Sequence, residues 1–121
     1  MAATTARKVP FSVAASVKVV ATATAGTAVH AAGATADGSI YDEIYLWAWN
    51  SHTADVVLTI EMYGVTVPEN TIEVTIPFDS GLVLVLPGML LENSQAVAAF
   101  ATVANVVAVY GFVNRITQDA D

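Results

Sequence analysis

The sequence YDEIYLWAWNSHTADVVLTIEMY, at residues 41–63, decides the fold. Side chains of a strand alternate between its two faces, so the first half of this segment has one aliphatic and one aromatic face. The aliphatic face consists of Ile44, Leu46 and Ala48, and the aromatic face consists of Tyr45, Trp47 and Trp49. The second half also alternates, and residues 50–55 between the halves are turn formers. We therefore predict a long β-hairpin whose aliphatic face packs on a second sheet, while the aromatic face needs the rest of a core or another subunit.

The remainder of the chain reads as short strands separated by turns. Strands are predicted near residues 16–24, 27–32, 71–76, 82–91, 95–103 and 106–116. Residues 71–76 show the clearest apolar–polar alternation, and Pro87-Gly88 interrupts the strand at 82–91, where we expect a bulge or bend. The strand spacing and the absence of a convincing helix predict an all-β fold. The expected architecture is an antiparallel β-sandwich of about eight strands, and a jelly roll is one form of it.

The ends of the chain depart from this pattern. Residues 1–10, MAATTARKVP, have no apolar period and contain Arg7 and Lys8, two of the four Lys and Arg residues. We predict an extended N-terminal arm, which either reaches a neighbouring subunit or lies on its own domain. Residues 11–116 are predicted to form a single β-sandwich domain, and residues 117–121 a short acidic tail.

The composition argues against several classes of function. Eleven acidic residues against four basic ones give a net charge of −7, which disfavours binding to nucleic acid or to an anionic membrane surface. The lack of cysteine excludes disulfides and thiolate chemistry. Only 12% of the residues are charged and 55% are hydrophobic, which leaves few charges to cover the surface of a small domain. We therefore expect partners to bury part of that surface.

Residues 96–113, AVAAFATVANVVAVYGFV, are long enough to raise the possibility of a transmembrane helix. Thr102, Asn105 and Gly111 interrupt the segment, and its β-branched content suits buried strands better. The N-terminus does not match a signal peptide, because Pro10 and Lys18 break the apolar segment that one requires. We expect no membrane segment and synthesis in the cytoplasm.

No residue pattern indicates catalysis, a cofactor or a metal, and we predict a protein that is not an enzyme. A small hydrolase, with a Ser-His-acid triad assembled across the fold, is the least favoured hypothesis. His30 and His52 are expected to be hydrogen-bonded or exposed. Asp42 and Glu43 are adjacent and point to opposite faces of a strand. Asp37 and Asp42 match no calcium-loop pattern, so we expect solvated loop acids.

The aromatic row on residues 45–49 has three readings: part of the core, a subunit interface, or a platform on which sugar rings stack. Its position in mid-strand favours the first two. Together with the arm, it gives the set of residues that we predict at a partner interface: Arg7, Lys8, Pro10, Phe11, Tyr45, Trp47 and Trp49.

The segments DEIYLWAWN, VVLTIEMYGV, NTIEVTIPFDSGLVLVLPGMLLEN and ANVVAVYGFVNRI resemble those of small, cysteine-free β-sandwich proteins among the virion structural proteins of tailed bacteriophages. The resemblance covers residues 42–116 and consists of strands and turns, while residues 1–40 match no pattern. It implies a decoration or cement protein on the capsid exterior, homo-oligomeric with a trimer as the first expectation, that contacts the major capsid protein. The alternative is a receptor or glycan-binding module of a tail or head fibre.

Overall fold

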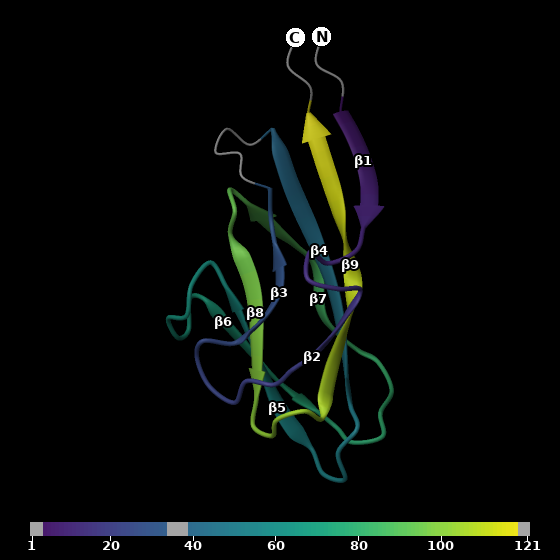
Figure 1. Ribbon diagram of the computed structural model, residues 1–121, viewed down its shortest axis with the longest axis vertical. Helices are drawn as coiled ribbons and strands as arrows, with labels where there is room; N and C mark the ends of the chain where they lie inside the picture. Colours follow the sequence, from purple (N-terminus) through teal and green to yellow (C-terminus); the bar gives the residue numbers. More distant parts are fainter. Residues whose placement is uncertain (1–3, 34–38, 119–121) are drawn as a thin grey trace.

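The computed structural model describes residues 4–33 and 39–118, and within these ranges the chain forms nine β-strands and no helix (Figure 1). The strands are β1 (Thr4–Val9), β2 (Ser16–Lys18), β3 (Thr27–Ala31), β4 (Ile40–Asn50), β5 (Val56–Met62), β6 (Thr71–Ile76), β7 (Val83–Glu92), β8 (Ala96–Ala101) and β9 (Val107–Gln118). All strand pairs are antiparallel. The predicted all-β sandwich is confirmed, and β1 is added to the eight predicted strands.

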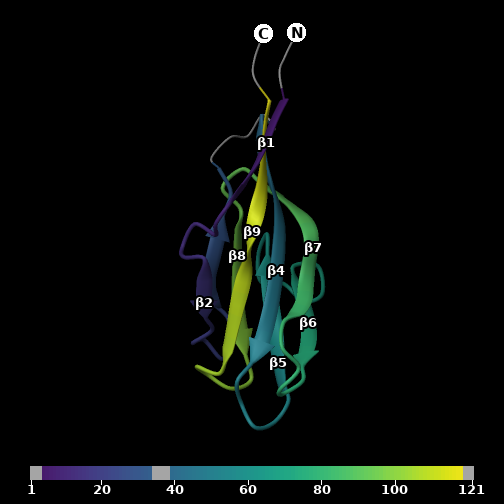
Figure 2. The ribbon, with the colours of Figure 1, turned by 90° about the vertical axis from the view of Figure 1, so that its right-hand side faces the viewer.

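The strands form two packed sheets. Sheet A has the order β1-β9-β4-β7, and β2 also pairs with β9. Sheet B has the order β3-β8-β5-β6. Figure 2 looks onto sheet A, with sheet B behind it. Because β1 and β2 pair with different halves of β9, they act as one interrupted edge strand. From β2 onward every connection except β5–β6 crosses between the sheets, and this is the strand order of a jelly roll.

The predicted hairpin at residues 41–63 is wrong. Strand β4 pairs with β7 and β9 in sheet A, whereas β5 pairs with β6 and β8 in sheet B. The turn between them therefore carries the chain from one sheet to the other. Each arm finds a better partner elsewhere: β9 matches β4 along its whole length, and β6 forms the true hairpin with β5, with Val56 opposite Ile76.

The hydrophobic core lies between the sheets. The aliphatic face of β4 points into it, as predicted, with Ile44, Leu46 and Ala48 fully buried. Sheet B contributes Leu58 and Ile60, which are also fully buried. The alternation of β4 is therefore what turns its aromatic side chains to the outer face of sheet A.

Strand β1 decides between the two alternatives for the N-terminal arm, of which the structure describes residues 4–10. It pairs with β9 from Thr4 opposite Gln118 to Val9 opposite Val113, so it lies on its own domain. Five of its six residues are exposed, and its place in the sheet follows from backbone pairing with β9 rather than from burial. Strand β9 runs to Gln118, so residues 117 and 118 of the predicted tail belong to sheet A, and residues 119–121 lie outside the described residues.

Candidate interaction surface on the outer face of sheet A

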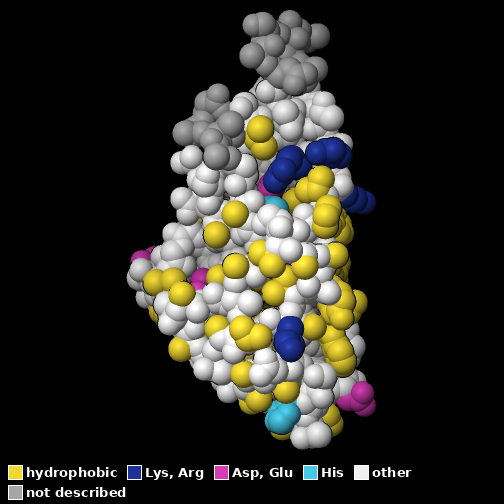
Figure 3. Space-filling model, in the orientation of Figure 1, with side chains coloured by type: hydrophobic (Ala, Val, Ile, Leu, Met, Phe, Trp, Pro, Cys, Tyr) yellow, Lys and Arg dark blue, Asp and Glu magenta, His cyan; other side chains and the backbone are white. Residues whose placement is uncertain are grey.

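The outer face of sheet A brings together aromatic and aliphatic side chains from three strands. Trp47 on β4 lies opposite Leu84 on β7 and Tyr110 on β9. One step further along the strands, Tyr45 lies opposite Pro87 and Phe112. In the orientation of Figure 1, apolar side chains continue down the right-hand side, where sheet A lies, with Lys and Arg side chains at the upper end (Figure 3). We call the surface formed by Tyr45, Trp47, Trp49, Leu84, Pro87, Tyr110 and Phe112 the outer face.

Three rings form a cradle at the upper part of the outer face. Tyr45 stacks on Phe112 with ring centroids 5.1 Å apart, and Trp47 is tilted against Phe112 at 6.0 Å. The Lys8 ammonium lies 5.3 Å from the centroid of the Phe112 ring, within range of a cation–π attraction. Beside the rings, the side-chain amide of Asn114 donates a 3.0 Å hydrogen bond to a carboxylate oxygen of Glu43. The cradle thus combines apolar rings with an amide, a carboxylate and an ammonium.

The interruption at Pro87-Gly88 shapes this cradle. The pairing of β7 with β4 shifts register on both sides of Tyr45 and Leu46, which confirms the predicted bulge. A Cβ atom on Gly88 would lie 2.9 Å from the Tyr45 ring. Glycine at this position therefore leaves the space that the Tyr45 ring occupies.

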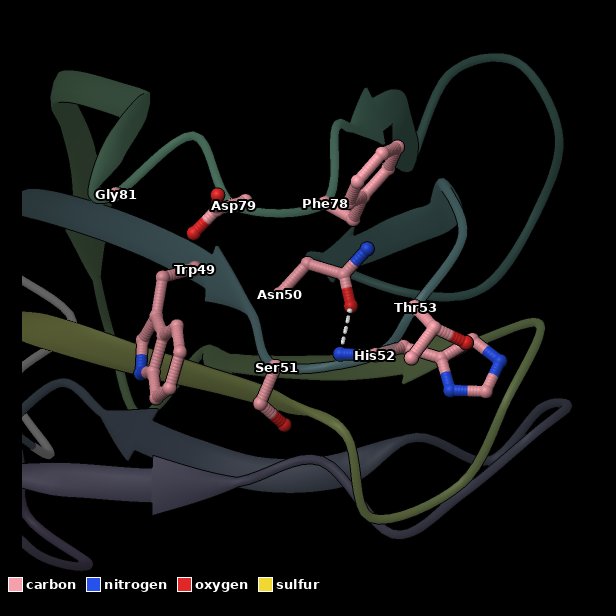
Figure 4. Close-up of a pocket in the computed structure, with 8 residues that line it drawn as sticks. All are labelled: Trp49, Asn50, Ser51, His52, Thr53, Phe78, Asp79 and Gly81. Atoms are coloured by element: carbon pink, nitrogen blue, oxygen red, sulfur yellow. Dashed lines mark hydrogen bonds between the residues drawn. The ribbon is translucent and has the colours of Figure 1, made fainter.

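The lower part of the outer face is more open. Trp49 is 36% exposed and lines a shallow hollow with Gly81, Leu82 and Tyr110. On its other side Trp49 borders a second hollow with Phe78 and Asp79, and the Asp79 carboxylate points towards it (Figure 4). This end of the outer face carries Trp49 and Tyr110, and Asp79 is the acidic side chain at its border, beside the polar residues 50–53 that also line the second hollow.

Asn50 fixes the turn below this hollow. Its side-chain oxygen accepts a 2.8 Å hydrogen bond from the backbone N–H of His52 (Figure 4). Its amide donates to the carbonyl oxygens of Ala54 and Ile76, at 2.8 and 3.0 Å. One buried side chain therefore holds the crossing from β4 to β5 and ties it to the end of β6.

The predicted interface residues separate into two groups. Tyr45 and Trp47 are half-buried and Trp49 is exposed, so the aromatic row is not part of the core. Lys8 joins the outer face at its upper end, through Phe112. These residues are brought together on one surface.

The other residues of the arm lie elsewhere. Arg7 is opposite Arg115 in the register of β1 with β9, and it therefore points to the other side of sheet A from Lys8. Pro10 is exposed. Phe11 is 2% exposed and packs in the chain's own core, with its ring 6.2 Å from that of His30. Phe11 therefore cannot anchor on a neighbouring subunit while the domain is folded.

Sequence reasoning missed Phe112, Tyr110 and Leu84. The alternation of β9 hints that Tyr110 and Phe112 share a face, but only the register with β4 shows that they meet Trp47 and Tyr45. That register joins residues more than sixty positions apart and has no local signal.

A second cluster lies buried at the upper end of the sandwich. Asp42 is fully buried, and its carboxylate receives hydrogen bonds from Arg115 Nε at 2.8 Å and Nη2 at 3.0 Å. Its Oδ2 is also 2.7 Å from His30 Nε2. The prediction of a solvated loop acid is therefore wrong for Asp42, and Asp37 lies outside the described residues. His30 is hydrogen-bonded, as predicted.

The geometry around His30 does not form a nucleophile–base pair. Its Nδ1 accepts the backbone N–H of Ser12 at 2.9 Å, which makes Nε2 the nitrogen that donates to Asp42. The Ser12 hydroxyl accepts the N–H of Ala31 at 2.9 Å. The cluster therefore ties β3 of sheet B to β4 and β9 of sheet A.

The Asp42 cluster predicts a loss of stability in acid. Burial acts to raise the pKa of Asp42, but hydrogen bonds from Arg115 and His30, together with the positive charge of Arg115, outweigh it and hold that pKa below its ordinary value. A lowered carboxyl pKa stabilises the fold above about pH 4, the unfolded value, and this contribution is lost as pH falls through the folded pKa. Denaturant titrations between pH 2 and 7 should show Asp42→Asn approaching the wild type at low pH. A constant difference between the two proteins would contradict this.

Within residues 4–33 and 39–118, no group of three or more His, Asp or Glu side chains is arranged to hold a metal ion. The same residues include no helix long and apolar enough to cross a membrane. Comparison with known proteins finds no protein family that matches the sequence, no similar curated protein and no similar solved structure. The resemblance to phage virion proteins therefore rests on the strand and turn pattern of residues 42–116.

Proposed function

We propose that the chain is a structural protein that decorates or cements a bacteriophage capsid. In this proposal it is made in the host cytoplasm, forms a homo-oligomer, and sits on the capsid exterior against the major capsid protein. The observation that carries the proposal is the outer face, a broad apolar surface on β9, β4 and β7 of sheet A. Figure 2 shows that no described loop covers the middle of this face. Surfaces of this kind mark protein–protein contacts.

The two sides of the sandwich differ in a way that supports an assembly role. On sheet B, the outward carboxylate of Glu61 is only 3% exposed, because it accepts hydrogen bonds from the Thr24 hydroxyl at 2.7 Å and the Gly26 N–H at 2.8 Å. The loop before β3 thus covers part of sheet B with the chain's own residues. Sheet A carries its large rings without such a cover, and burying them in an assembly stabilises it by about 25 cal/mol per Å², offset by the entropy of association.

The jelly-roll fold is compatible with the proposal but does not decide it. Jelly rolls occur in viral capsid proteins and also in lectins, and a fold by itself does not fix a function. An assembly protein would bridge neighbouring capsid subunits through many copies of one contact. The contact needs no reacting group, only an apolar surface that excludes water.

The test is the presence of the protein on purified phage particles, measured by mass spectrometry as a ratio to the major capsid protein. We expect a fixed ratio, and we expect Leu84→Asp, in the exposed part of the outer face, to reduce attachment at least tenfold. Val67→Asp is the matched control, because Val67 is 75% exposed in the connection between β5 and β6. Particles that lack the protein, or that bind both variants equally, would contradict the proposal.

A receptor or glycan-binding module is the second candidate, and the cradle is the observation that favours it. The rings of Tyr45, Trp47 and Phe112 offer apolar faces to the C–H side of a sugar ring. The Asn114–Glu43 pair beside them offers polar partners for hydroxyl groups. A glycan array that is positive for the wild type and blank for a folded Trp47→Ala variant would select this candidate over the capsid role.

A further inference from the structure

We propose that the outer face binds a second copy of the same chain, related by a two-fold axis that runs parallel to the strands of sheet A. This inference rests on the proposed homo-oligomer and deepens it, since it names a second copy, rather than the capsid, as the partner that covers the outer face; Leu84→Asp would then reduce attachment to particles by separating the pair. It rests on how charges are distributed around that face and on the size of the face.

The register of sheet A places its outward basic residues along one edge. Lys8 on β1 begins a row that continues with Asn114 on β9 and Glu43 on β4. Lys18 on β2 begins a lower row with Ala108 and Trp49. Both lysines are exposed. The β1/β2 edge of the outer face is therefore positive at its upper and lower ends.

The opposite side of the same face is acidic. Glu92 at the end of β7 lies opposite Tyr41 on β4, so its side chain shares the outward side of the sheet. Asp79, in the turn that leads into β7, borders the hollow beside Trp49 (Figure 4). Together with Glu43, these residues make the β7 side negative at its upper and lower ends. Between the two charged borders the face is apolar.

A two-fold axis parallel to the strands matches these borders. Such a rotation keeps the height along the strands and exchanges the two edges, so the β1/β2 edge of one copy meets the β7 edge of the other. Lys8 then approaches the upper acids Glu43 and Glu92, and Lys18 approaches Asp79. The same contacts occur twice, and the aromatic rings stack against those of the partner in the centre. A two-fold axis that ran across the strands, in the plane of the interface, would place each edge against the same edge of the partner. Borders of like charge would then face each other.

The size of the outer face suits a specific pair. From Ala108 to Ile116 the outward side of sheet A, which contains the outer face and its charged borders, is roughly 27 Å long, and four strands make it roughly 19 Å wide, at about 3.4 Å per residue and about 4.8 Å between strands. Its flat area of about 500 Å² is a lower bound, because side-chain relief adds accessible surface, and it compares with the roughly 800 Å² that each partner contributes to a standard interface. Two chains with a net charge of −7 each repel overall, so association requires this local complementarity.

The self-complementary pattern favours a two-fold pair over the trimer expected from capsid symmetry. A cyclic trimer joins two different patches of each copy, whereas a two-fold pair joins one patch to itself. The outer face has a positive border and a negative border, so it is complementary to itself. A two-fold pair requires this self-complementarity. The pair leaves sheet B of each copy on the outside of the dimer.

The first test is the mass of the purified full chain by sedimentation equilibrium at micromolar concentrations. We expect twice the chain mass of 12.6 kDa. Leu84→Asp should weaken the pair at least tenfold, and Val67→Asp, on the connection between β5 and β6, should leave it unchanged. Far-ultraviolet circular dichroism checks that both variants remain folded. A monomeric wild type, a trimer, or a dimer that is indifferent to Leu84→Asp would overturn the inference.

The second test reverses the charged borders separately. One variant carries Lys8→Glu and Lys18→Glu, and the other carries Asp79→Lys and Glu92→Lys. The net charge of −7 becomes −11 in the first and −3 in the second. Each variant alone should lose self-association at least tenfold, because its two borders then have the same sign. An equimolar mixture should restore a dimer that contains one copy of each.

The mixture separates local from overall electrostatics. Both variants remain net negative, so a general attraction between oppositely charged proteins cannot produce the mixed dimer. The restored dimer should weaken as salt increases, since its border contacts are exposed. Failure of the mixture to pair overturns the two-fold arrangement. These mixtures contain no capsid, so they test the pairing apart from the proposed function. A dimer that is absent from phage particles would contradict the proposed function and leave the pairing intact. A monomer bound to particles would contradict the pairing and leave the proposed function intact.

Discussion

Replacing Asp42 with asparagine should lower the free energy of unfolding by about 3 kcal/mol or more. The carboxylate accepts both hydrogen bonds of Arg115 and the one from His30, on its two oxygens. Asparagine keeps one oxygen and turns an NH₂ group towards donors, so at least one buried donor loses its acceptor. Arg115 is 29% exposed at its side chain and can regain some water, whereas His30 cannot. Urea titration at pH 7 measures the loss.

Glu43→Gln is the matched control for this substitution. Glu43 is the next carboxylate on β4, but it is half-buried on the opposite side of the sheet and accepts its hydrogen bond from Asn114. Glutamine retains an oxygen that can accept that bond, so we expect a change within about 0.5 kcal/mol. Equal, small effects of the two substitutions would mean that the Asp42 cluster does not hold the two sheets together.

The Asp42 cluster shows where sequence reasoning stops. The alternation on β4 correctly places Asp42 and Glu43 on opposite faces, because that depends only on neighbouring residues. The burial of Asp42 near the start of β4 depends on its contacts with Arg115 and His30. Arg115 is 73 positions away along the chain. A short acidic sequence near a loop is usually solvated, and nothing local distinguishes this exception.

The same contrast separates the well-predicted strands from the rest. Residues 71–76 were predicted with the bounds that β6 has, because their alternation and the following Pro77 are local signals. Strand β1 was not predicted, since TTARKV has no apolar period and its strand form comes from backbone pairing with β9. The crossing at residues 51–55 has the same turn formers as a hairpin. The crossing forms instead of a hairpin because β4 pairs with β9 and β5 pairs with β6.

The outer face was predicted in part. The aromatic row on β4 was expected to need a cover from a core or from a partner, and the structure excludes the core. The rows that extend the face onto β7 and β9, and the charged borders at Lys8 and Glu92, depend on strand order. That order is a property of the whole jelly roll, so the sequence of any one strand cannot reveal it.

Replacing Gly111 with alanine should lower the free energy of unfolding by about 3 kcal/mol or more, through strain and overpacking. Gly111 lies on β9 opposite Leu46, with φ of 155°, a backbone conformation that other residues rarely adopt. A Cβ atom there would overlap the carbonyl oxygen of Tyr45 and lie 2.8 Å from Cζ of Phe11. The first obstacle is backbone, so β9 and β4 would have to separate locally at the centre of sheet A.

Gly81→Ala is the matched control, because it tests the strain of a positive φ without a steric clash of the added Cβ atom. Gly81 also has a positive φ, 73°, but a Cβ atom there would meet nothing within 4 Å. Its substitution should therefore cost about 1 kcal/mol, the price of a left-handed backbone alone. Thermal and denaturant unfolding of the two variants should rank Gly111→Ala well below Gly81→Ala. Similar losses in both would show that β4 and β9 can shift apart without disturbing the core.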